Sequence, residues 1–364
     1  MKLIYLITLI LLTSCFNHSK TDDVKIENVE KILIEIKYAN GFIIEDSNKE
    51  FTLIKINSNQ SKFNFSDSIY ISHSESFNGN NKKVLSQNLK NIALQSSTYF
   101  SYLSVLNKLS LVGGLSGLQY FNSSYLNNKI NKDSICEIGV NGSIQMESLL
   151  KVNPDLFLIY PFELDNQAQY NSKGIETLLI SEYLEKSPLG RLEWLKLFGL
   201  ILDENQLAND YFDKVVINYK DNIKAIDSTK TMFFNLPFKD NWNMPNSNSI
   251  TANLLSDAGF NYIFSDSIND NAIRSKEEVW DKAIYSEYWV IIASRPEGFS
   301  LDDLIAEAPI YARFPSVLNK KVIFCNTATT DYFTMGIVEP DVMLKDLNNL
   351  FNPDYIAKYF KILK

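Results

Sequence analysis

The chain has 364 residues, a net charge of -8 and 45% hydrophobic residues, which suffices for two packed domains of ordinary size. Nucleic-acid binding needs a clustered basic face, and the net negative charge and scarcity of arginine argue against it. The few arginines are Arg191, Arg274, Arg295 and Arg313.

Residues 1–15 are typical of a bacterial lipoprotein signal peptide. Lys2 precedes an apolar run over residues 3–12, and Thr13 and Ser14 lead to Cys15. A transmembrane anchor is the alternative, but a spanning helix needs about 20 apolar residues and this run is far shorter. We therefore expect lipid on Cys15 and a protein anchored in the cell envelope, at the inner or the outer membrane. The polar residues 16–28 are predicted to form a flexible tether.

Residues 29–75 are predicted to form a small antiparallel β region. Runs rich in β-branched and aromatic residues occur at 32–38, 42–45 and 51–56, with turn residues between them. Asn40 and Gly41 lie between the first two runs, and this dipeptide is typical of a hairpin turn.

Strand and helix patterns alternate in two later regions, residues 76–187 and 229–340. This alternation predicts two α/β lobes with parallel, Rossmann-like sheets. In the first region the predicted strands are 109–112, 136–139, 156–160 and 177–180, and the predicted helices are 98–108 and 143–151. In the second region the strands are 231–235, 261–264, 288–293 and 322–325, and the helices are 250–257, 276–284 and 301–308.

Residues 188–228 are predicted to form a long helix that joins the lobes. Apolar residues recur there at helical spacing, Pro188 suits a helix start, and Asp203 is suited to cap a second segment. A helix makes this joint stiffer than the usual strands or loops. Residues 341–364 are predicted to form a terminal helix that Pro353 interrupts.

The candidate ligand site follows from the order of the elements. In open parallel sheets ligands bind beyond the carboxyl ends of the strands. The residues that follow the predicted strands are mainly aromatic, with one cation, which suits a large, flat or partly apolar ligand with negative charge. For each ring, packing beneath a loop is the alternative. The candidate ligand-binding residues are Tyr120, Tyr160, Trp242, Arg295 and Tyr332.

The glycines at positions 113, 114 and 117 match neither the dinucleotide fingerprint nor the phosphate loop. We therefore predict a tight turn at a strand end there, and no nucleotide site.

Histidine and cysteine are too sparse for a catalytic or metal site. The histidines are His18, in the tether, and His73, so neither a zinc site nor a Ser-His-Asp triad is expected. With Cys15 lipidated, Cys136 and Cys325 remain, and buried free thiols are favoured over a disulfide. We expect no catalytic residue, no metal site and no cofactor.

An ordered set of motifs resembles the substrate-binding lipoproteins of ABC importers for iron chelates, haem and vitamin B12, in a branch found in Bacteroidota-type bacteria. The resemblance covers residues 37–353. Its motifs include Tyr38-Ala39-Asn40-Gly41-Phe42, Leu111-Val112-Gly113-Gly114, Met146-Glu147 before Asn153-Pro154-Asp155, Ser187-Pro188-Leu189-Gly190-Arg191, Trp242-Asn243-Met244-Pro245 and Ser275-Lys276-Glu277.

This resemblance implies two lobes joined by a rigid helix, and a monomer without enzymatic activity. It implies capture of an iron-siderophore or related metal chelate between the lobes and delivery to an ABC permease dimer with its ATPase. Haem or cobalamin is the alternative ligand. The chain departs from the branch at Tyr99, where a histidine is usual, and Tyr120 or Tyr332 is suited to act as an axial ligand of haem. Two further functions stay open: a chelatase-like enzyme that uses the same cleft, and a scavenging lipoprotein that passes its ligand to an outer-membrane receptor.

The resemblance also assigns one acidic residue on each lobe, Glu147 and Glu277, to docking on arginines of the permease. Each is predicted near the start of a helix, where the helix dipole stabilises a carboxylate. Local helix stability is therefore the alternative role of both residues.

Overall fold

The computed structural model describes residues 35–60, 63–74, 77, 79, 83–86, 88–118, 134–140, 143–265 and 273–364. The chain divides into two compact units, Met1–Lys31 and Ile32–Lys364, and every described residue belongs to the second. Cys15, the tether at 16–28 and Tyr120 lie outside the described residues. Within the described part of the chain, no helix is long and apolar enough to cross a membrane.

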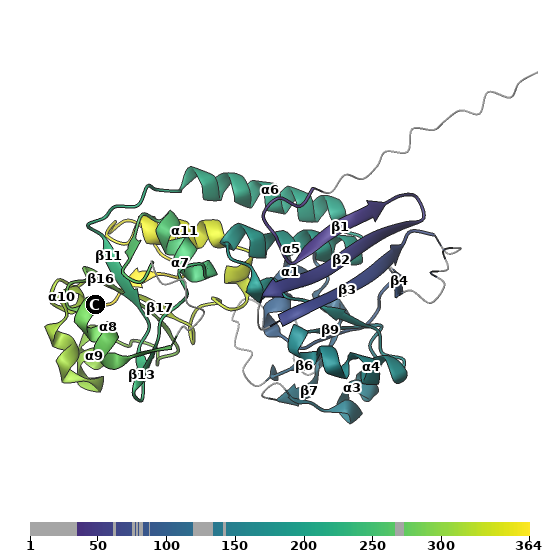
Figure 1. Ribbon diagram of the computed structural model, residues 1–364, viewed down its shortest axis with the longest axis horizontal. Coiled ribbons are helices and arrows are strands. Elements are labelled where there is room, and N and C mark those ends of the chain that lie inside the picture. The colour runs from purple at the N-terminus through teal and green to yellow at the C-terminus, as the bar shows by residue number, and fades with distance from the viewer. Residues whose placement is uncertain are drawn as a thin grey trace, which may run out of the picture. The chain divides into compact units, whose positions relative to one another are not determined.

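The first described elements form a four-stranded sheet in the order β1-β2-β3-β4 (Figure 1). Its strands are β1 (Phe42–Ser47), β2 (Phe51–Gln60), β3 (Phe63–Ser72) and β4 (Val84–Ser86). The first three strands are antiparallel, as predicted, and β4 pairs in parallel with β3. Alternate residues of β2, including Ile54 and Ile56, are buried, so one face of the sheet belongs to the core.

The hairpin predicted at Asn40 and Gly41 is wrong, because residues 35–41 form no strand. Their backbone N–H groups bind two buried carboxylates instead of a neighbouring strand. Glu193 accepts from the amides of Lys37, Tyr38 and Ala39, the last two at 2.6 and 2.9 Å.

Glu185 is the second carboxylate that binds this N-terminal segment. It accepts from the amides of Asn40 at 3.0 Å and Gly41 at 2.9 Å, and from the indole N–H of Trp194 at 2.9 Å. A side chain at position 41 has no room, because its Cβ would lie 2.6 Å from the Trp194 ring. The segment is therefore held against the long helical region far along the chain.

The N-terminal lobe is built on a six-stranded sheet in the order β10-β9-β5-β6-β7-β8. Neighbouring strands are parallel except for the pair β7 and β8. The strands are β5 (Ile92–Leu94), β6 (Val112–Ser116), β7 (Cys136–Val140), β8 (Ser143–Ile144), β9 (Leu156–Ile159) and β10 (Thr177–Leu179). The helices are η1 (Ser97–Tyr99), α1 (Phe100–Val105), η2 (Leu109–Leu111), α3 (Met146–Val152), η5 (Pro161–Asn166), α4 (Gln167–Ser172) and η6 (Glu182–Leu184).

Three sequence predictions for this sheet need correction. The strand predicted at residues 109–112 starts only at its last residue, because residues 109–111 form η2 and β6 continues to Ser116. The central strand β5 is absent from the predicted strands, because three residues are too few for a periodic signal. Gly113 and Gly114 lie inside β6 rather than in a turn after it. A Cβ at position 114 would lie 2.8 Å from the Ile138 side chain, so the glycine is needed for close packing with β7.

The C-terminal lobe is built on a five-stranded sheet in the order β14-β11-β16-β17-β18, parallel except for the last pair. Its strands are β11 (Thr231–Phe234), β14 (Asn261–Tyr262), β16 (Tyr288–Ala293), β17 (Val322–Asn326) and β18 (Lys361–Ile362). A small antiparallel sheet contains β12 (Pro237–Phe238), β13 (Asn241–Asn243) and β15 (Ile273–Ser275). The helices are α7 (Ile250–Asp257), α8 (Lys276–Ala283), α9 (Leu301–Glu307), η7 (Pro309–Arg313), α10 (Pro315–Leu318), η8 (Met335–Ile337) and α11 (Pro340–Asn348).

The predicted linking helix is two helices, α5 (Pro188–Ile201) and α6 (Asn205–Asp221), which pack against each other (Figure 1). The chain reverses at Asp203, whose φ of 56° ends the first helix; Asp203 does not cap the second. Gly199 allows the close approach, since its Cβ would lie 2.6 Å from that of Ala208.

Helix α5 is buried along its whole length except at Arg191. It contacts α1 of the N-terminal lobe and α7 and α11 of the C-terminal lobe, so one rigid element serves both cores. This explains the apolar residues on every side of the helix.

The terminal helix predicted for residues 341–364 is correct only in its first part. Helix α11 ends at Asn348, and the chain then returns to add β18 to the edge of the C-terminal sheet. The buried carboxylate of Asp346 accepts from the amides of Lys358, Tyr359 and Phe360. These bonds satisfy backbone groups that a helix would have paired internally.

We predict that Glu193→Gln lowers the free energy of unfolding by about 2–3 kcal/mol, because several charge-assisted hydrogen bonds are lost. It also leaves the buried ammonium of Lys196, 3.0 Å from Glu193, without its carboxylate. Urea denaturation measures the change. Glu204→Gln is the control, because its ion pair with Lys108 is partly exposed, and we expect a change below about 1 kcal/mol. Equal effects of both substitutions would contradict the role given to Glu193.

Candidate functional site

Strand order places a candidate site at the carboxyl edge of each parallel sheet. In the N-terminal lobe the first strand, β5, lies between β9 and β6, so the chain runs outward from it in both directions. In the C-terminal lobe the same reversal occurs between β11 and β16. Ligands of open α/β sheets bind beyond the carboxyl ends of strands at such a reversal.

A cluster of polar side chains lies at the reversal in the N-terminal lobe. Ser96 and Thr98 follow β5, Tyr160 follows β9, and Glu182 follows β10. The hydroxyls of Ser96 and Thr98 are 2.8 Å apart, and both interact with the hydroxyl of Tyr160. Thr98 also donates to Glu182 at 3.1 Å. Burial raises the pKa of Tyr160, so its hydroxyl remains a neutral hydrogen-bonding group at ordinary pH.

Glu182 and Arg191 form the charged part of this cluster. The Glu182 carboxylate is completely buried and accepts from the Arg191 guanidinium at 3.2 Å. Burial raises the pKa of Glu182, and Arg191 opposes this shift. The Tyr102 hydroxyl of α1 donates to the Arg191 carbonyl at 2.7 Å, and this bond holds the backbone of α5 in place at Arg191.

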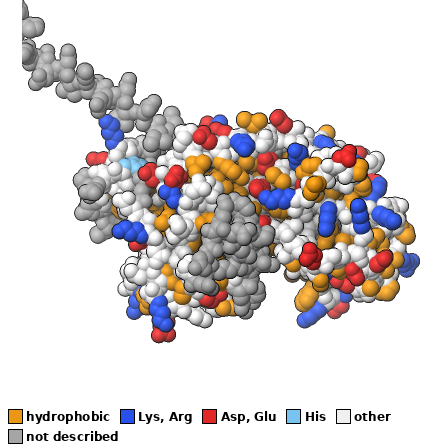
Figure 2. Space-filling model, turned by 180° about the vertical axis from the view of Figure 1, so that it is seen from behind, with side chains coloured by type: hydrophobic (Ala, Val, Ile, Leu, Met, Phe, Trp, Pro, Cys, Tyr) orange, Lys and Arg blue, Asp and Glu red, His pale blue; other side chains and the backbone are white. Residues whose placement is uncertain are grey.

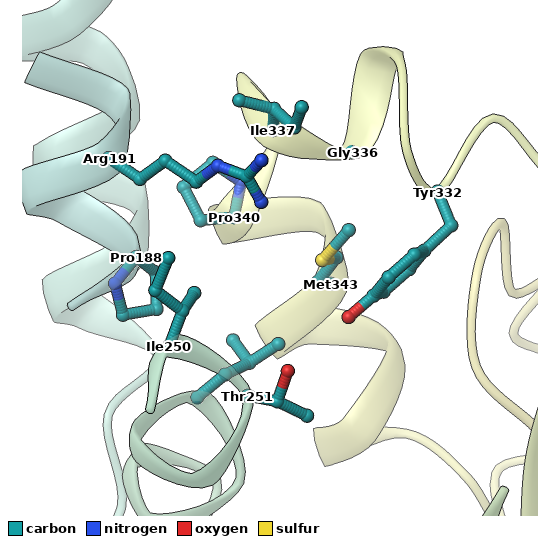
Figure 3. Close-up of a pocket in the computed structure, with 10 residues that line it drawn as sticks. Pro188, Arg191, Ile250, Thr251, Tyr332, Gly336, Ile337, Pro340 and Met343 are labelled. Atoms are coloured by element: carbon teal, nitrogen blue, oxygen red, sulfur yellow. The ribbon is translucent and has the colours of Figure 1, made fainter. Parts of the chain in front are cut away.

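Arg191 also reaches a small cavity between helix α5 and the C-terminal lobe. The cavity has a volume of about 30 Å³, enough for a water molecule or two. Figure 3 shows the guanidinium ending inside it, with Tyr332 on the opposite side and Thr251 beside the tyrosine hydroxyl. Burial raises the pKa of Tyr332 to about 12, so this residue is also neutral.

Buried polar atoms without a hydrogen-bond partner concentrate around this pair. Such atoms are rare in native proteins, and a group of them indicates a place where water or a ligand binds. Among the described residues, those near the carboxyl edge of the N-terminal sheet are Gln95 Nε2, Ser181 Oγ, Glu182 Oε2, Tyr183 OH and Arg191 Nε.

In the C-terminal lobe, Asn326 joins the loops that follow β16 and β17. Its side chain accepts from the Arg295 amide at 3.1 Å and donates to the Arg295 carbonyl at 2.9 Å. The Arg295 guanidinium pairs with Glu307 of α9 at 2.8 Å and remains partly exposed. Arg295 therefore lies at the carboxyl edge, as predicted, with its charge balanced by a carboxylate.

The predicted aromatic residues lie mostly behind the surface. Trp242 is completely buried, and its indole N–H donates to the Phe234 carbonyl at 2.8 Å, so the expectation that its ring faces a ligand is not met. Tyr160 and Tyr332 are half-buried. The structure brings Tyr332 to Arg191, but Arg295 and Trp242 do not line that cavity.

The rings exposed at the carboxyl edges belong to phenylalanines. Phe162 follows β9 with 51% of its surface exposed, Phe238 follows β11 with 75%, and Phe333 follows β17 with 54%. Phe162 stacks on Tyr160, with ring centroids 5.0 Å apart, and Phe333 packs edge-on against Tyr332 at 5.0 Å. The predicted tyrosines thus support the phenylalanines that reach solvent.

Sequence reasoning did not select Glu182 or Arg191 as site residues. Arg191 is the one polar position of α5 that is not buried, yet it lies within a helix rather than after a strand. A signal was available, because an arginine at the start of an otherwise apolar helix needs an anionic partner or a polar cavity.

The two predicted docking residues are exposed at the starts of helices. Glu147 lies in the first turn of α3, which follows β8, and Glu277 lies in the first turn of α8, which follows β15. The neighbouring Glu278 pairs with Arg274. On the face seen in Figure 2, acidic and basic side chains are interspersed, without a basic patch of the kind that binds nucleic acid.

Within the described residues, no group of three or more histidine, cysteine, aspartate and glutamate side chains could hold a metal ion. Cys136 and Cys325 are free thiols, and burial raises the pKa of Cys325 to about 12. His73 lies in the first β sheet region, with its Nε2 2.8 Å from the Thr52 hydroxyl, outside both carboxyl edges.

Comparison with known proteins identifies the family. The family model described as periplasmic binding protein matches residues 96–329. The chain belongs to this family. Periplasmic binding proteins bind solutes and are not enzymes, which confirms the expectation of a non-catalytic protein. An uncharacterized lipoprotein of Methanocaldococcus jannaschii is 27% identical over 296 residues, which are 76% of this chain and 68% of the relative.

Solved structures confirm the two-lobed fold of this periplasmic binding protein. The ABC-type Fe3+-hydroxamate transport system of Saccharomonospora viridis aligns with a TM-score of 0.55 and 17% identity, over 72% of this chain and 93% of that one. The periplasmic haem-binding protein HutB of Vibrio cholerae aligns with a TM-score of 0.57 and 17% identity, over 72% of this chain and 99% of that one. At these identities the likeness concerns the fold alone.

We predict that Trp242→Ala lowers the free energy of unfolding by about 3–5 kcal/mol, because a large buried ring and its hydrogen bond are removed. Phe238→Ala removes an exposed ring four positions earlier in the chain, and it should change the free energy of unfolding by less than about 0.5 kcal/mol. Chemical denaturation of both variants tests the assignment of Trp242 to the core. If Trp242→Ala were as stable as the parent protein, the ring would have to serve another purpose.

Proposed function

We propose that this periplasmic binding protein captures an iron-siderophore or related metal chelate at the facing carboxyl edges and delivers it to an ABC permease without altering it. The observation that carries the proposal is the placement of exposed phenylalanine rings at the ends of β9, β11 and β17. A single exposed ring needs no explanation, but three such rings in the loops that follow parallel strands, where ligands of open α/β sheets bind, suit an apolar binding surface. The fold shared with an Fe3+-hydroxamate protein and a haem protein supports the same ligand class.

The cations at these edges suit a ligand with anionic oxygen atoms. Among the described residues, Arg191 has one side-chain hydrogen bond, to Glu182, although a guanidinium carries five N–H donors. Arg295 is partly exposed beside its partner Glu307. Ring faces together with arginine suit a chelate that combines apolar surface with carboxylate, hydroxamate or catecholate oxygens.

Haem or a corrinoid is the second candidate, and the exposed rings favour it. A planar macrocycle presents a broad apolar face, for which Phe162, Phe238 and Phe333 are suited. Tyrosine is an axial ligand of haem iron in some proteins, and Tyr332 and Tyr160 are the half-buried tyrosines that support two of these rings.

We predict that replacing Phe162, Phe238 or Phe333 by alanine weakens ligand binding by about 1–2 kcal/mol each, the usual size for an aromatic contact at a binding site. Calorimetric titration of purified protein with ferrichrome, ferric citrate, haemin and cyanocobalamin, side by side, identifies the ligand and measures the losses. Phe351→Ala is the matched control, because this ring is 60% exposed but lies after α11, away from the parallel strand ends. Binding of none of the four probes by the parent protein, or unchanged affinity in all three variants, would refute the proposed site.

We also propose that Glu147 and Glu277 dock the loaded protein on the permease. Each carboxylate is exposed at the start of a helix that follows a short strand, one in each lobe. Glu278 is less suited to this role because Arg274 already neutralises it. One exposed charge on each lobe would set orientation and association rate more than total affinity.

Reversal of both charges, Glu147→Lys with Glu277→Lys, should reduce uptake of the identified ligand at least about tenfold, since two charge pairs become repulsive. Affinity in solution should be unchanged, because neither residue is among the rings and arginines that are proposed to contact the ligand. Uptake by cells that carry the variant together with the cognate permease measures the effect. Asp302→Lys, which reverses an exposed charge in the first turn of α9, is the control. Parental uptake by the double variant would exclude docking through these residues.

A lipid on Cys15 is part of the proposal. The lipoprotein relative supports it, and the sequence after Cys15 is largely polar over residues 16–28, which suits a tether. Mass spectrometry of the mature N-terminus tests this: a terminus other than diacylated Cys15 would exclude the anchor.

A further inference from the structure

Glu182 has a buried carboxylate that is not needed for an apolar core. Its hydrogen bonds indicate that it has another role. A fully buried carboxylate is normally paired through both oxygens. Here Oε1 accepts from Thr98 and Arg191, whereas Oε2 has no partner among the described residues. The only cation paired with this carboxylate in the described part of the chain is Arg191.

The geometry of the pair leaves most of the guanidinium unused. Glu182 binds Arg191 through Nη2 only, and Nε is buried without a partner in the described part of the chain. The rest of the group ends in the cavity that Tyr332 and Thr251 line from the C-terminal lobe (Figure 3). Because Thr98 donates to the carboxylate and the carboxylate binds Nη2 of Arg191, the guanidinium is held in place before any ligand arrives.

We propose that Glu182 is a positioning residue that directs Arg191 toward the ligand, and that the ligand therefore presents an anionic oxygen to Arg191. This inference rests on the proposed function and narrows it to anionic chelates. A guanidinium that is already oriented loses less side-chain freedom on binding, which increases affinity. It also presents two parallel N–H donors, the geometry that a carboxylate or a similar bidentate group accepts.

The titratable groups around Glu182 make the proposal measurable as a pH effect. Those that face it are tyrosines and one arginine, and burial raises the pKa of each tyrosine, so none of them titrates in the acid range. They are Tyr99, Tyr102, Tyr160, Tyr183 and Arg191. Since burial also raises the pKa of Glu182, the carboxylate should lose its charge at a higher pH than an ordinary glutamate. Affinity for an anionic ligand should then fall as the pH is lowered through that pKa.

The test compares anionic probes, haemin and ferric citrate, with uncharged probes, cyanocobalamin and ferrichrome, in the full-length protein. Glu182→Gln keeps the volume and one acceptor, and it should weaken binding of the anionic probe about three- to tenfold, because the arginine side chain is then ordered only when the ligand binds. It should also abolish the decrease at low pH. Thr98→Val, which frees the carboxylate but keeps its charge, should give a smaller loss, and Arg191→Gln the largest. Glu278→Gln removes the carboxylate of another Glu–Arg pair, Arg274 and Glu278, and is the matched control.

The outcomes separate this inference from the proposed function. If the parent protein binds none of the four probes, the proposed function fails. If it binds only an uncharged probe, or if Glu182→Gln leaves affinity and pH dependence unchanged, the positioning role is overturned. Tighter anion binding by Glu182→Gln would also overturn it, because Glu182 would then compete with the ligand for Arg191. Thermal unfolding of each variant establishes that the fold is retained.

Discussion

The structure depends on buried carboxylates that bind backbone N–H groups around helix α5. Glu193 within this helix and Glu185 just before it accept hydrogen bonds from the segment 37–41, which has no strand or helix of its own. A buried amide without a partner is costly, and a carboxylate accepts several of them at once. Helix α5 in turn contacts α1 on one side and α7 and α11 on the other. The N-terminal segment, the linking region and both lobes are thus joined at one place.

Buried carboxylates also act near the C-terminus, at Asp346, and at the proposed ligand site, at Glu182. Asp346 binds three amides of residues 358–360 and lets the chain return as β18. Glu182 binds the side chains of Thr98 and Arg191, and its Oε2 has no hydrogen-bond partner among the described residues. A carboxylate that is fully satisfied stabilises the fold, whereas one that is partly satisfied marks a site where another group can bind. This difference is the reason why Glu182, and not Glu193, Glu185 or Asp346, is proposed to act at the ligand site.

Stiffness between the lobes follows from how the linking helices pack. Helix α6 lies along α5 with Gly199 against Ala208, and it reaches the C-terminal lobe through the Tyr219 hydroxyl, which donates to Asp257 at 2.6 Å. Because two packed helices join the lobes, we expect ligand capture to rely on side chains at the carboxyl edges more than on a wide closing motion. The exposed phenylalanines and the oriented arginine are consistent with a surface that is prepared in advance.

The sequence by itself determined the periodic elements. The helix at 250–257 and the strand at 288–293 were predicted with the bounds that the structure has, because a long apolar pattern with a clear period leaves one choice. Parallel pairing also followed, since alternation of strand and helix favours parallel sheets, and the carboxyl-edge rule then pointed to the loops that follow these strands. Within those loops, the sequence pointed to Tyr160 and Trp242, whereas the structure exposes their neighbours Phe162 and Phe238.

Only the tertiary structure decided which of two adjacent rings faces solvent, which carboxylate is buried, and where the segment 35–41 finds its hydrogen bonds. These properties depend on contacts between residues far apart in the chain, such as Glu193 with Lys37 and Gly114 with Ile138. Local periodicity carries no information about such contacts. The pairing of Glu182 with Arg191 also depends on such distant contacts. Arg191 extends into a cavity whose other lining residues, such as Tyr332, lie far later in the chain.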